Sequence, residues 1–224
     1  MTKFIYKSWW KVLAVVLIFY TLIAGFLIDV PRLPIVHETI RNTYYHVPMW
    51  MAMLTVFSIS VVYSIKYLMT GKTEYDMIAV ECVNTGTYFY ALGLITGMIW
   101  ANYTWGEFWS SDPKQNGAAI AFLLYCAYLI LRNSIDEEQQ RGRISAVYNI
   151  FAFPVMLVLI MILPKMTASL HPGSGGNAGF GQMKYSNLMR LVLYPSFIGW
   201  SLLAVWIASL RYRMRLLEYK AYTI

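Results

Sequence analysis

Six long apolar segments constrain this chain more than any other feature of its sequence. A helix needs about 20 largely apolar residues to cross the hydrocarbon core of a bilayer. Segments of this kind recur along the chain and cover approximately residues 9–28, 47–69, 77–100, 117–131, 144–163 and 188–210. Because a backbone in lipid has to satisfy its own hydrogen bonds, we predict an all-α integral membrane fold, a bundle of about six transmembrane helices.

The composition supports this fold class. Of the 224 residues, 58% are hydrophobic and 13% are charged, and the mean hydropathy is +0.50. Little polar sequence remains for a soluble unit, so we expect residues 1–224 to form a single domain. The two cysteines, Cys82 and Cys126, lie inside apolar segments without a CxxC spacing, which excludes a thiol-redox motif and a zinc knuckle.

The distribution of Lys and Arg predicts the orientation of the bundle. The first apolar segment follows Lys3, Lys7 and Lys11, is long enough to span and lacks a clear small-residue cleavage site, so we interpret it as an uncleaved anchor. With the N-terminus inside, twelve of the eighteen Lys and Arg residues fall on the inner side. The other six are Arg32, Arg41, Lys114, Lys165, Lys184 and Arg190. This bias predicts that both termini are cytoplasmic, and it explains the net charge of +7 without nucleic acid binding.

Three connections are expected on the outer side, and all three histidines belong to that side. These connections cover approximately residues 29–47, 100–116 and 164–187. His46 lies among aromatic and apolar neighbours in YYHVPMWM, which favour the neutral imidazole that binds metals. His171 begins a glycine-rich stretch that can fold back over the bundle, whereas His37, beside Glu38, is the least distinctive. A single histidine at a membrane surface is, in most proteins, only a polar residue.

The stretch WANYTWGEFWSSDPKQN, residues 100–116, is the most distinctive of the chain. Trp and Tyr are enriched at membrane interfaces in any membrane protein, so an aromatic belt is the plain interpretation. The order W-G-x-x-W-x-x-D-P is more compact than a belt requires. Trp105 and Trp109 have the i, i+4 spacing that places two side chains on one helical face, which predicts a single flat apolar surface.

Two further features of this stretch concern its backbone. Gly106 would let a planar group approach closely, since it has no side chain. Asp112 before Pro113 predicts the start of the next helix, with Asn116 as a second candidate cap.

Haem is the planar group that these residues suit. Two histidines do not complete a structural zinc site, which takes four ligands, but they are enough for both axial positions of a haem iron. Trp105 and Trp109 would supply an apolar bed, and Lys114 and Arg41 are candidate partners for the propionates. Spacing in the sequence does not show that these groups converge.

The chain resembles the haem-handling proteins of cytochrome c maturation, and among them the heme exporter protein C (CcmC) type more than the larger CcsA or CcmF types. The resemblance covers about residues 9–215 and is strongest at RNTYYHVP (41–48), LITGMIWANYTWGEFWSSDPK (94–114) and SLHPGS (169–174). It implies that His46 and His171 are the axial ligands of a haem b at the outer face. The implied haem bed consists of Trp100, Trp105, Gly106, Trp109 and Asp112.

The resemblance also implies partners and a location. Haem would pass to a periplasmic CcmE-like chaperone, with ABC-transporter subunits of the CcmA and CcmB type and a small CcmD-like subunit in the bacterial cytoplasmic membrane. The function would be delivery, with no catalysis beyond positioning haem for capture by the chaperone. One departure is Ser111, which stands where the family commonly has a tryptophan in WxWD.

Three other functions remain open. A membrane b-type cytochrome would carry its histidine ligands within the spans, and we place none there. A transporter would carry ionisable or polar groups near mid-membrane, for which Glu81 and Asn84 are the only hints. A structural anchor would leave the tryptophan motif unexplained.

Overall fold

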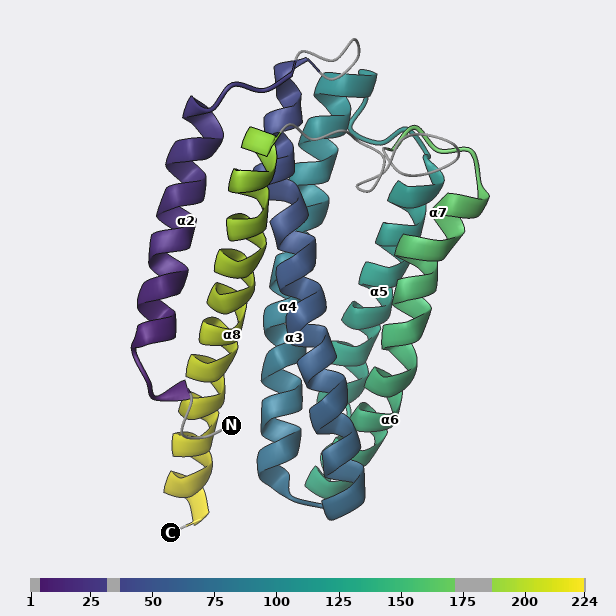
Figure 1. The fold of residues 1–224 in the computed structure, drawn as a ribbon. Coiled ribbons are helices and arrows are strands. Elements are labelled where there is room, and N and C mark those ends of the chain that lie inside the picture. Colours follow the sequence, from purple (N-terminus) through teal and green to yellow (C-terminus); the bar gives the residue numbers. More distant parts are fainter. Residues whose placement is uncertain (1–4, 32–36, 172–186, 224) are drawn as a thin grey trace.

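The computed structural model describes residues 5–31, 37–171 and 187–223. Within these ranges it contains six helices that are long and apolar enough to cross a membrane, as predicted (Figure 1). The long helices are α2 (Trp9–Leu27), α3 (Thr43–Thr70), α4 (Thr73–Trp105), α5 (Pro113–Asn133), α6 (Glu138–Leu157) and α8 (Asn187–Thr223). Three short elements accompany them, the 3₁₀ helix η1 (Glu38–Asn42), the π-helical segment η2 (Val158–Ile162) and α7 (Leu163–Met166).

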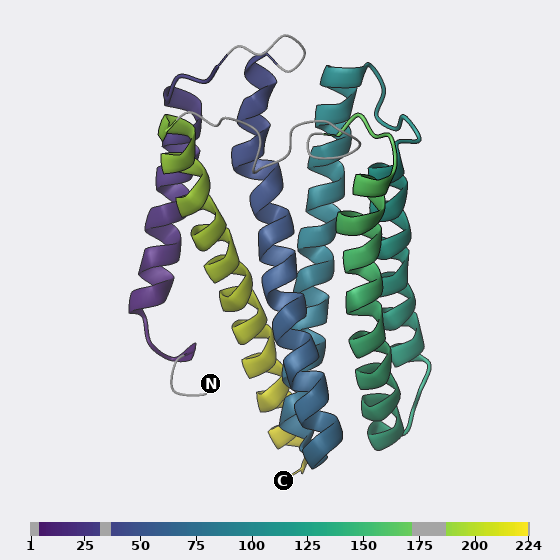
Figure 2. The same ribbon diagram turned by 45° about the vertical axis from the view of Figure 1, so that its right-hand side comes forward.

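The helices α3 and α4 form the centre of the bundle. Figures 1 and 2 show α2 and α8 on one side of this pair and α5 and α6 on the other. The first turns of α2 and the last turns of α8 lie at the same end, which we call the inner end in accordance with the charge bias. The η1 helix, the connection between α4 and α5, and residues 167–171 after α7 lie at the opposite, outer end.

Small residues allow the central helices to approach closely. A Cβ on Gly86 of α4 would lie 2.3 Å from the ring of Phe57 on α3. That ring in turn stacks on Tyr125 of α5, with ring centroids 3.8 Å apart. At the outer end, a Cβ on Gly117 of α5 would lie 2.4 Å from the carbonyl oxygen of Leu159, so α5 packs directly on the backbone of η2.

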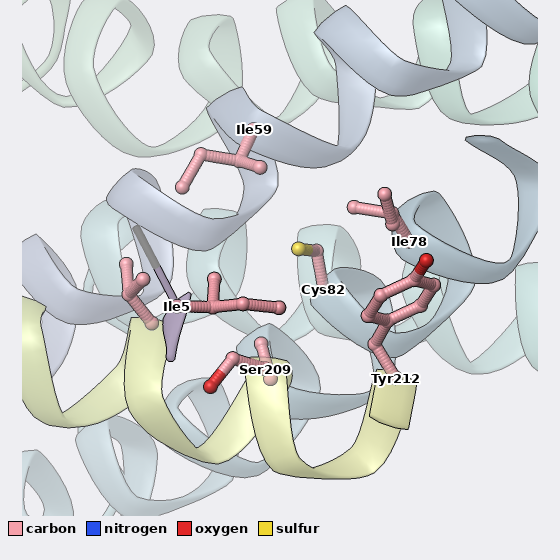
Figure 3. A pocket seen from close by; sticks show the side chains of 8 residues that line it. Ile5, Ile59, Ile78, Cys82, Ser209 and Tyr212 are labelled. Carbon is pink, nitrogen blue, oxygen red and sulfur yellow. The ribbon is translucent and has the colours of Figure 1, made fainter. Parts of the chain in front are cut away.

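The packing leaves one small apolar pocket near the inner end. Its volume is about 20 Å³, room for roughly one water molecule. Figure 3 shows its lining, which includes Ile5, Ile59, Ile78, Cys82, Ser209 and Tyr212. A cavity of this size does not accommodate a cofactor.

The helices extend beyond the predicted apolar segments. The second apolar segment was predicted from about residue 47, but α3 begins at Thr43 and includes Pro48 in its second turn. The prediction that the spans contain no histidine is therefore wrong for His46, which lies in the first turn of α3 and within the span candidate His37–Thr70. Similarly, α4 continues to Trp105, beyond the predicted end of its apolar segment at about residue 100. Helix α6 begins at Glu138, before the predicted start of its apolar segment at about residue 144. Hydrophobicity marks the part of a helix that lies in lipid, whereas capping residues decide where the helix ends.

Candidate functional site

His46 faces α4 from the first turn of α3. Its imidazole packs over Gly97, where a Cβ would lie 2.9 Å from Cε1. Its Nδ1 lies 3.0 Å from Thr96 Oγ1, and the indole Nε1 of Trp50, one turn further along α3, donates to its Nε2 at 3.2 Å. The absence of a side chain at Gly97 therefore makes room for the imidazole ring, and Thr96 and Trp50 fix its orientation.

These two contacts determine the tautomer of His46. The Trp50 indole can only donate, so Nε2 has to offer its lone pair. The Thr96 hydroxyl donates to the Leu92 carbonyl at 2.8 Å, so its oxygen accepts a hydrogen bond from the Nδ1–H of His46. His46 is thus held as a neutral imidazole with the proton on Nδ1 and a lone pair on Nε2.

His171 lies beside two of the predicted tryptophans. Its ring centroid is 6.0 Å from that of Trp100 and 6.4 Å from that of Trp105. The two indoles contact each other edge to face at 5.3 Å. Trp100 follows Gly97 by one turn of α4, so the two histidines lie against neighbouring turns of one helix. His171 and Lys114 are also close enough to His46 to affect its electrostatic environment.

Asp112 connects the tryptophan-rich connection to the segment that carries His171. As the N-cap of α5, it accepts the Lys114 N–H at Oδ1 (2.9 Å). The same carboxylate accepts from the Ser169 hydroxyl (3.0 Å) and from the Leu170 N–H (2.7 Å). The Ser169 Oγ then accepts the N–H of His171 at 3.1 Å. The buried Asp112 thus positions a proposed ligand, a role that the sequence pattern did not indicate.

Lys114 contacts the imidazole of His171. Its Nζ lies 3.3 Å from Nδ1. A lysine ammonium can only donate, so Nδ1 offers its lone pair and the proton of His171 lies on Nε2, the reverse of His46. A histidine that binds metal through Nε2 normally donates its Nδ1–H to an acceptor. Metal binding by His171 Nε2 therefore requires Lys114 to turn away.

Trp109 does not share a helical face with Trp105. The helix α4 ends at Trp105 because Gly106 adopts the left-handed conformation (φ 84°), with its N–H donating to the Asn102 carbonyl. Trp109 lies in the connection, where its Nε1 donates to Asn116 Oδ1 at 3.2 Å. The flat surface predicted from i, i+4 spacing is therefore not formed, and Trp105 pairs with Trp100 instead.

Ser111, which stands where the resemblance predicts a tryptophan, has an unusual backbone conformation. Ser111 has a positive φ of 55°, and its carbonyl accepts from Asn116 Nδ2 at 3.1 Å. A bulky residue is strained in this region of backbone space. The connection as folded here thus suits serine better than the tryptophan that the resemblance leads one to expect.

Arg41 donates hydrogen bonds to carbonyls at the C-terminal end of α2. Its Nη1 donates to the carbonyls of Gly25 (2.9 Å) and Ile28 (2.6 Å), and its guanidinium forms an ion pair with Glu38 at 3.7 Å. These carbonyls are among those that a helix C-terminus leaves without intrahelical partners. The structure thus gives Arg41 a capping role, and none of its described contacts joins it to the histidine–tryptophan group. His37 precedes η1 with a φ of 43°.

Comparisons with known proteins identify the family of this chain. The family model described as heme exporter protein C (CcmC) matches residues 2–223. A cytochrome c biogenesis protein CcsA of Prochlorococcus marinus (strain MIT 9515) is 37% identical over 102 residues, 46% of this chain and 32% of the relative. A CcsA of Parasynechococcus marenigrum (strain WH8102) is 32% identical over 96 residues, 43% of this chain and 31% of the relative. The match thus spans about a third of the length of these relatives. Since the family model covers nearly the whole chain, this multi-pass membrane protein belongs to the heme exporter protein C (CcmC) family.

Proposed function

We propose that this protein binds haem at the outer end of its bundle through His46 and His171 and passes it to a periplasmic haem chaperone during cytochrome c maturation. One observation carries the proposal. Two imidazoles from distant segments lie against neighbouring turns of α4, and Trp100 and Trp105 contact one of them. Membership of the heme exporter protein C family, and the name cytochrome c biogenesis protein of the relatives, support haem as the cargo.

The donor set fits a haem iron. His46 offers the Nε2 lone pair, since Thr96 holds the proton on Nδ1. The Trp50 N–H, which now contacts this lone pair, has to turn aside when iron takes its place. Among the described residues, no three His, Cys, Asp or Glu side chains form a metal site, so an iron brought by a porphyrin suits the pair better than a bare ion.

Lys114 couples the propionates to the second ligand. A propionate carboxylate is a stronger partner for an ammonium group than a neutral imidazole is, because the resulting hydrogen bond is charge-assisted at both ends. When Lys114 turns to a propionate, the ring proton of His171 can move to Nδ1, and Nε2 gains the lone pair that iron needs. Recognition of the carboxylate and ligation of the iron would then occur together.

The bound haem would be haem b. Covalent attachment of the c type uses a C-x-x-C-H motif, and Cys82 and Cys126 do not have this spacing. A haem held by two imidazoles and aromatic contacts can leave when an acceptor competes for the iron. The protein would therefore deliver haem without acting as an enzyme.

The partners follow from the family and from the orientation of the bundle. The charge bias supports a site on the periplasmic side of a bacterial cytoplasmic membrane, where a CcmE-like chaperone would accept the haem. ABC-transporter subunits of the CcmA and CcmB type and a small CcmD-like subunit would release the loaded chaperone.

Absorption spectra of the purified protein test the proposal. We expect the bands of six-coordinate low-spin haem in the parent, and a shift to five-coordinate bands or loss of haem in His46→Ala and in His171→Ala. His37→Ala is the matched control and should leave the spectrum unchanged. If His37→Ala alone altered the spectrum, the ligand assignment would be wrong. If haem neither co-purified nor bound on addition, the haem function itself would be excluded.

A further inference from the structure

A polar cavity opens at the inner end of the bundle, far along α4 from the two histidines. Its volume is about 460 Å³, and its lining comes from α4, α5, the connection after α5, α6 and α8. Three arginines contribute to the lining, together with one carboxylate, Asp136. They are Arg132, Arg141 and Arg215.

Two of these arginines are anchored by buried carboxylates. Arg132 donates to both oxygens of Asp76 at 2.8 and 2.6 Å. Arg215 donates through Nε to Glu81, which also accepts from Arg211. Glu81 is 2% exposed. Its charge is therefore matched within the protein, and this position, which hinted at a transporter, serves to hold α8 against α4.

The third arginine has no carboxylate partner among its described contacts. Arg141 donates through Nη1 to the carbonyls of Ile135 and Asp136, both at 3.4 Å. A guanidinium has five N–H donors, so Arg141 retains donors for a ligand, as does Arg215, which uses its Nε for Glu81. Asn84 and Asn133 add amide groups to the lining.

The charged residues that line the cavity, together with the charged side chains paired to them, carry an excess of one positive charge. Arg132, Arg141, Arg211 and Arg215 give four positive charges, and Asp76, Glu81 and Asp136 give three negative charges. A polar cavity with an excess of guanidinium charge favours an anion. Planar guanidinium groups match the oxygens of phosphate in particular.

We propose that this cavity binds the anionic phosphate group of an acidic phospholipid headgroup from the inner leaflet. Its position supports a lipid as the source, because the cavity lies between transmembrane helices at the end where Lys and Arg gather. Basic pockets at this level bind acidic headgroups, which are enriched on the cytoplasmic side. This inference is independent of the haem site, which lies at the other end of α4.

Lipid titration of the purified protein tests the proposal. Binding of phosphatidylglycerol, measured by native mass spectrometry and by the rise in Tm in detergent, should exceed that of phosphatidylcholine. Arg141→Gln should weaken phosphatidylglycerol binding roughly fivefold, the effect of one basic residue near an acidic surface. Arg141 forms no described ion pair, so this variant should fold.

Arg143→Gln is the matched control. Arg143 lies on the same helix two residues later, is exposed and does not line the cavity, so the same loss of charge there should leave lipid binding unchanged. A parallel titration with inorganic phosphate identifies the source of the anion. Stabilisation by phosphatidylglycerol alone supports the lipid, and equal stabilisation by phosphate supports a soluble phosphate ligand at the same site. Equal binding of both ligands by the parent and Arg141→Gln would overturn the proposal.

Discussion

At the scale of single residues, His46 and His171 hold their protons on different ring nitrogens. The Thr96 hydroxyl and the Trp50 indole keep the proton of His46 on Nδ1, while Lys114 keeps that of His171 on Nε2. One imidazole is thus prepared to bind iron through Nε2, and the other becomes so only when Lys114 leaves. In the proposed function this difference would assist release of haem, because Lys114 competes with the iron for His171.

Thr96 is expected to act as a positioning residue for His46. Thr96→Val removes the acceptor of the Nδ1 proton, and the loss of such a partner typically costs 10- to 100-fold in metal affinity. We therefore expect haem affinity, measured by absorbance titration, to fall by roughly one order of magnitude or more. Thr87→Val is the matched control, since Thr87 lies on the same helix and its hydroxyl contacts only its own helix, at Val83 O. Equal affinities in the two variants would contradict the role of Thr96.

Lys114 is expected to distinguish haem from its dimethyl ester. Lys114→Gln removes the ammonium group that we assign to a propionate, and a hydrogen bond to a charged group contributes about 1.5–3 kcal/mol. Haem binding should therefore weaken by at least about tenfold. Binding of haem dimethyl ester, which has no free carboxylate, should weaken little, because it has no carboxylate for the ammonium group of Lys114 to bind. A loss of the same size for both ligands would show that Lys114 does not bind a propionate.

At the scale of helices, the sequence predicted the existence of each span but not where it ends. The apolar runs identify the lipid-facing parts, so six helices were predictable. The end of α4 depends on the left-handed conformation of Gly106, and the start of α6 depends on Glu137, which caps the N–H groups of Gln139 and Gln140. Such local contacts leave no periodic signal, so the pairing of Trp105 with Trp100 was missed.

The sequence predicted which residues lie near one another at the site better than it predicted what each of them contacts. His46, His171, Trp100, Trp105 and Lys114 do converge at the outer end of the bundle. Asp112 is hydrogen-bonded to Ser169 and Leu170, which follow it by 57 and 58 positions in the chain. Nothing in the local sequence of either segment indicates such a contact. For Arg41 the positive charge suggested a propionate partner, whereas its described hydrogen bonds go to carbonyls at the end of α2.

The capping role of Arg41 leads to a prediction about helix α2. Arg41→Gln should lower the free energy of unfolding by about 1–3 kcal/mol, because buried carbonyls lose a charged donor. Haem affinity and the haem spectrum should stay as in the parent. Thermal unfolding and haem titration of the same preparation provide both measurements. Arg190→Gln is the control, since Arg190 is exposed at the outer end of α8. Weakened haem binding with unchanged stability would instead favour Arg41 as a propionate partner.

At the scale of the whole molecule, the two ends of the bundle have different chemistry. The inner end holds ion pairs between helices, Asp76 with Arg132 and Glu81 with Arg211 and Arg215. Among the described residues, the outer end gathers imidazole, indole and the buried carboxylate of Asp112, which accepts three hydrogen bonds. Helix α4 contributes to both ends. It is therefore the element that links the proposed lipid site at one end to the proposed haem site at the other.

The orientation of these two ends in the membrane is the last prediction. Twelve of the eighteen Lys and Arg residues lie on the side of the termini, which predicts that this side is cytoplasmic. Ser111, between α4 and α5, and Ser134, just after α5, are both exposed and lie at opposite ends of α5. In a chain with Cys82→Ser and Cys126→Ser, a membrane-impermeant maleimide should label Ser111→Cys in spheroplasts. The same reagent should label Ser134→Cys only in inverted vesicles. Detergent-solubilised protein, in which both positions should react, is the control. The reverse pattern would place the histidine–tryptophan group in the cytoplasm, where it could not load a periplasmic acceptor.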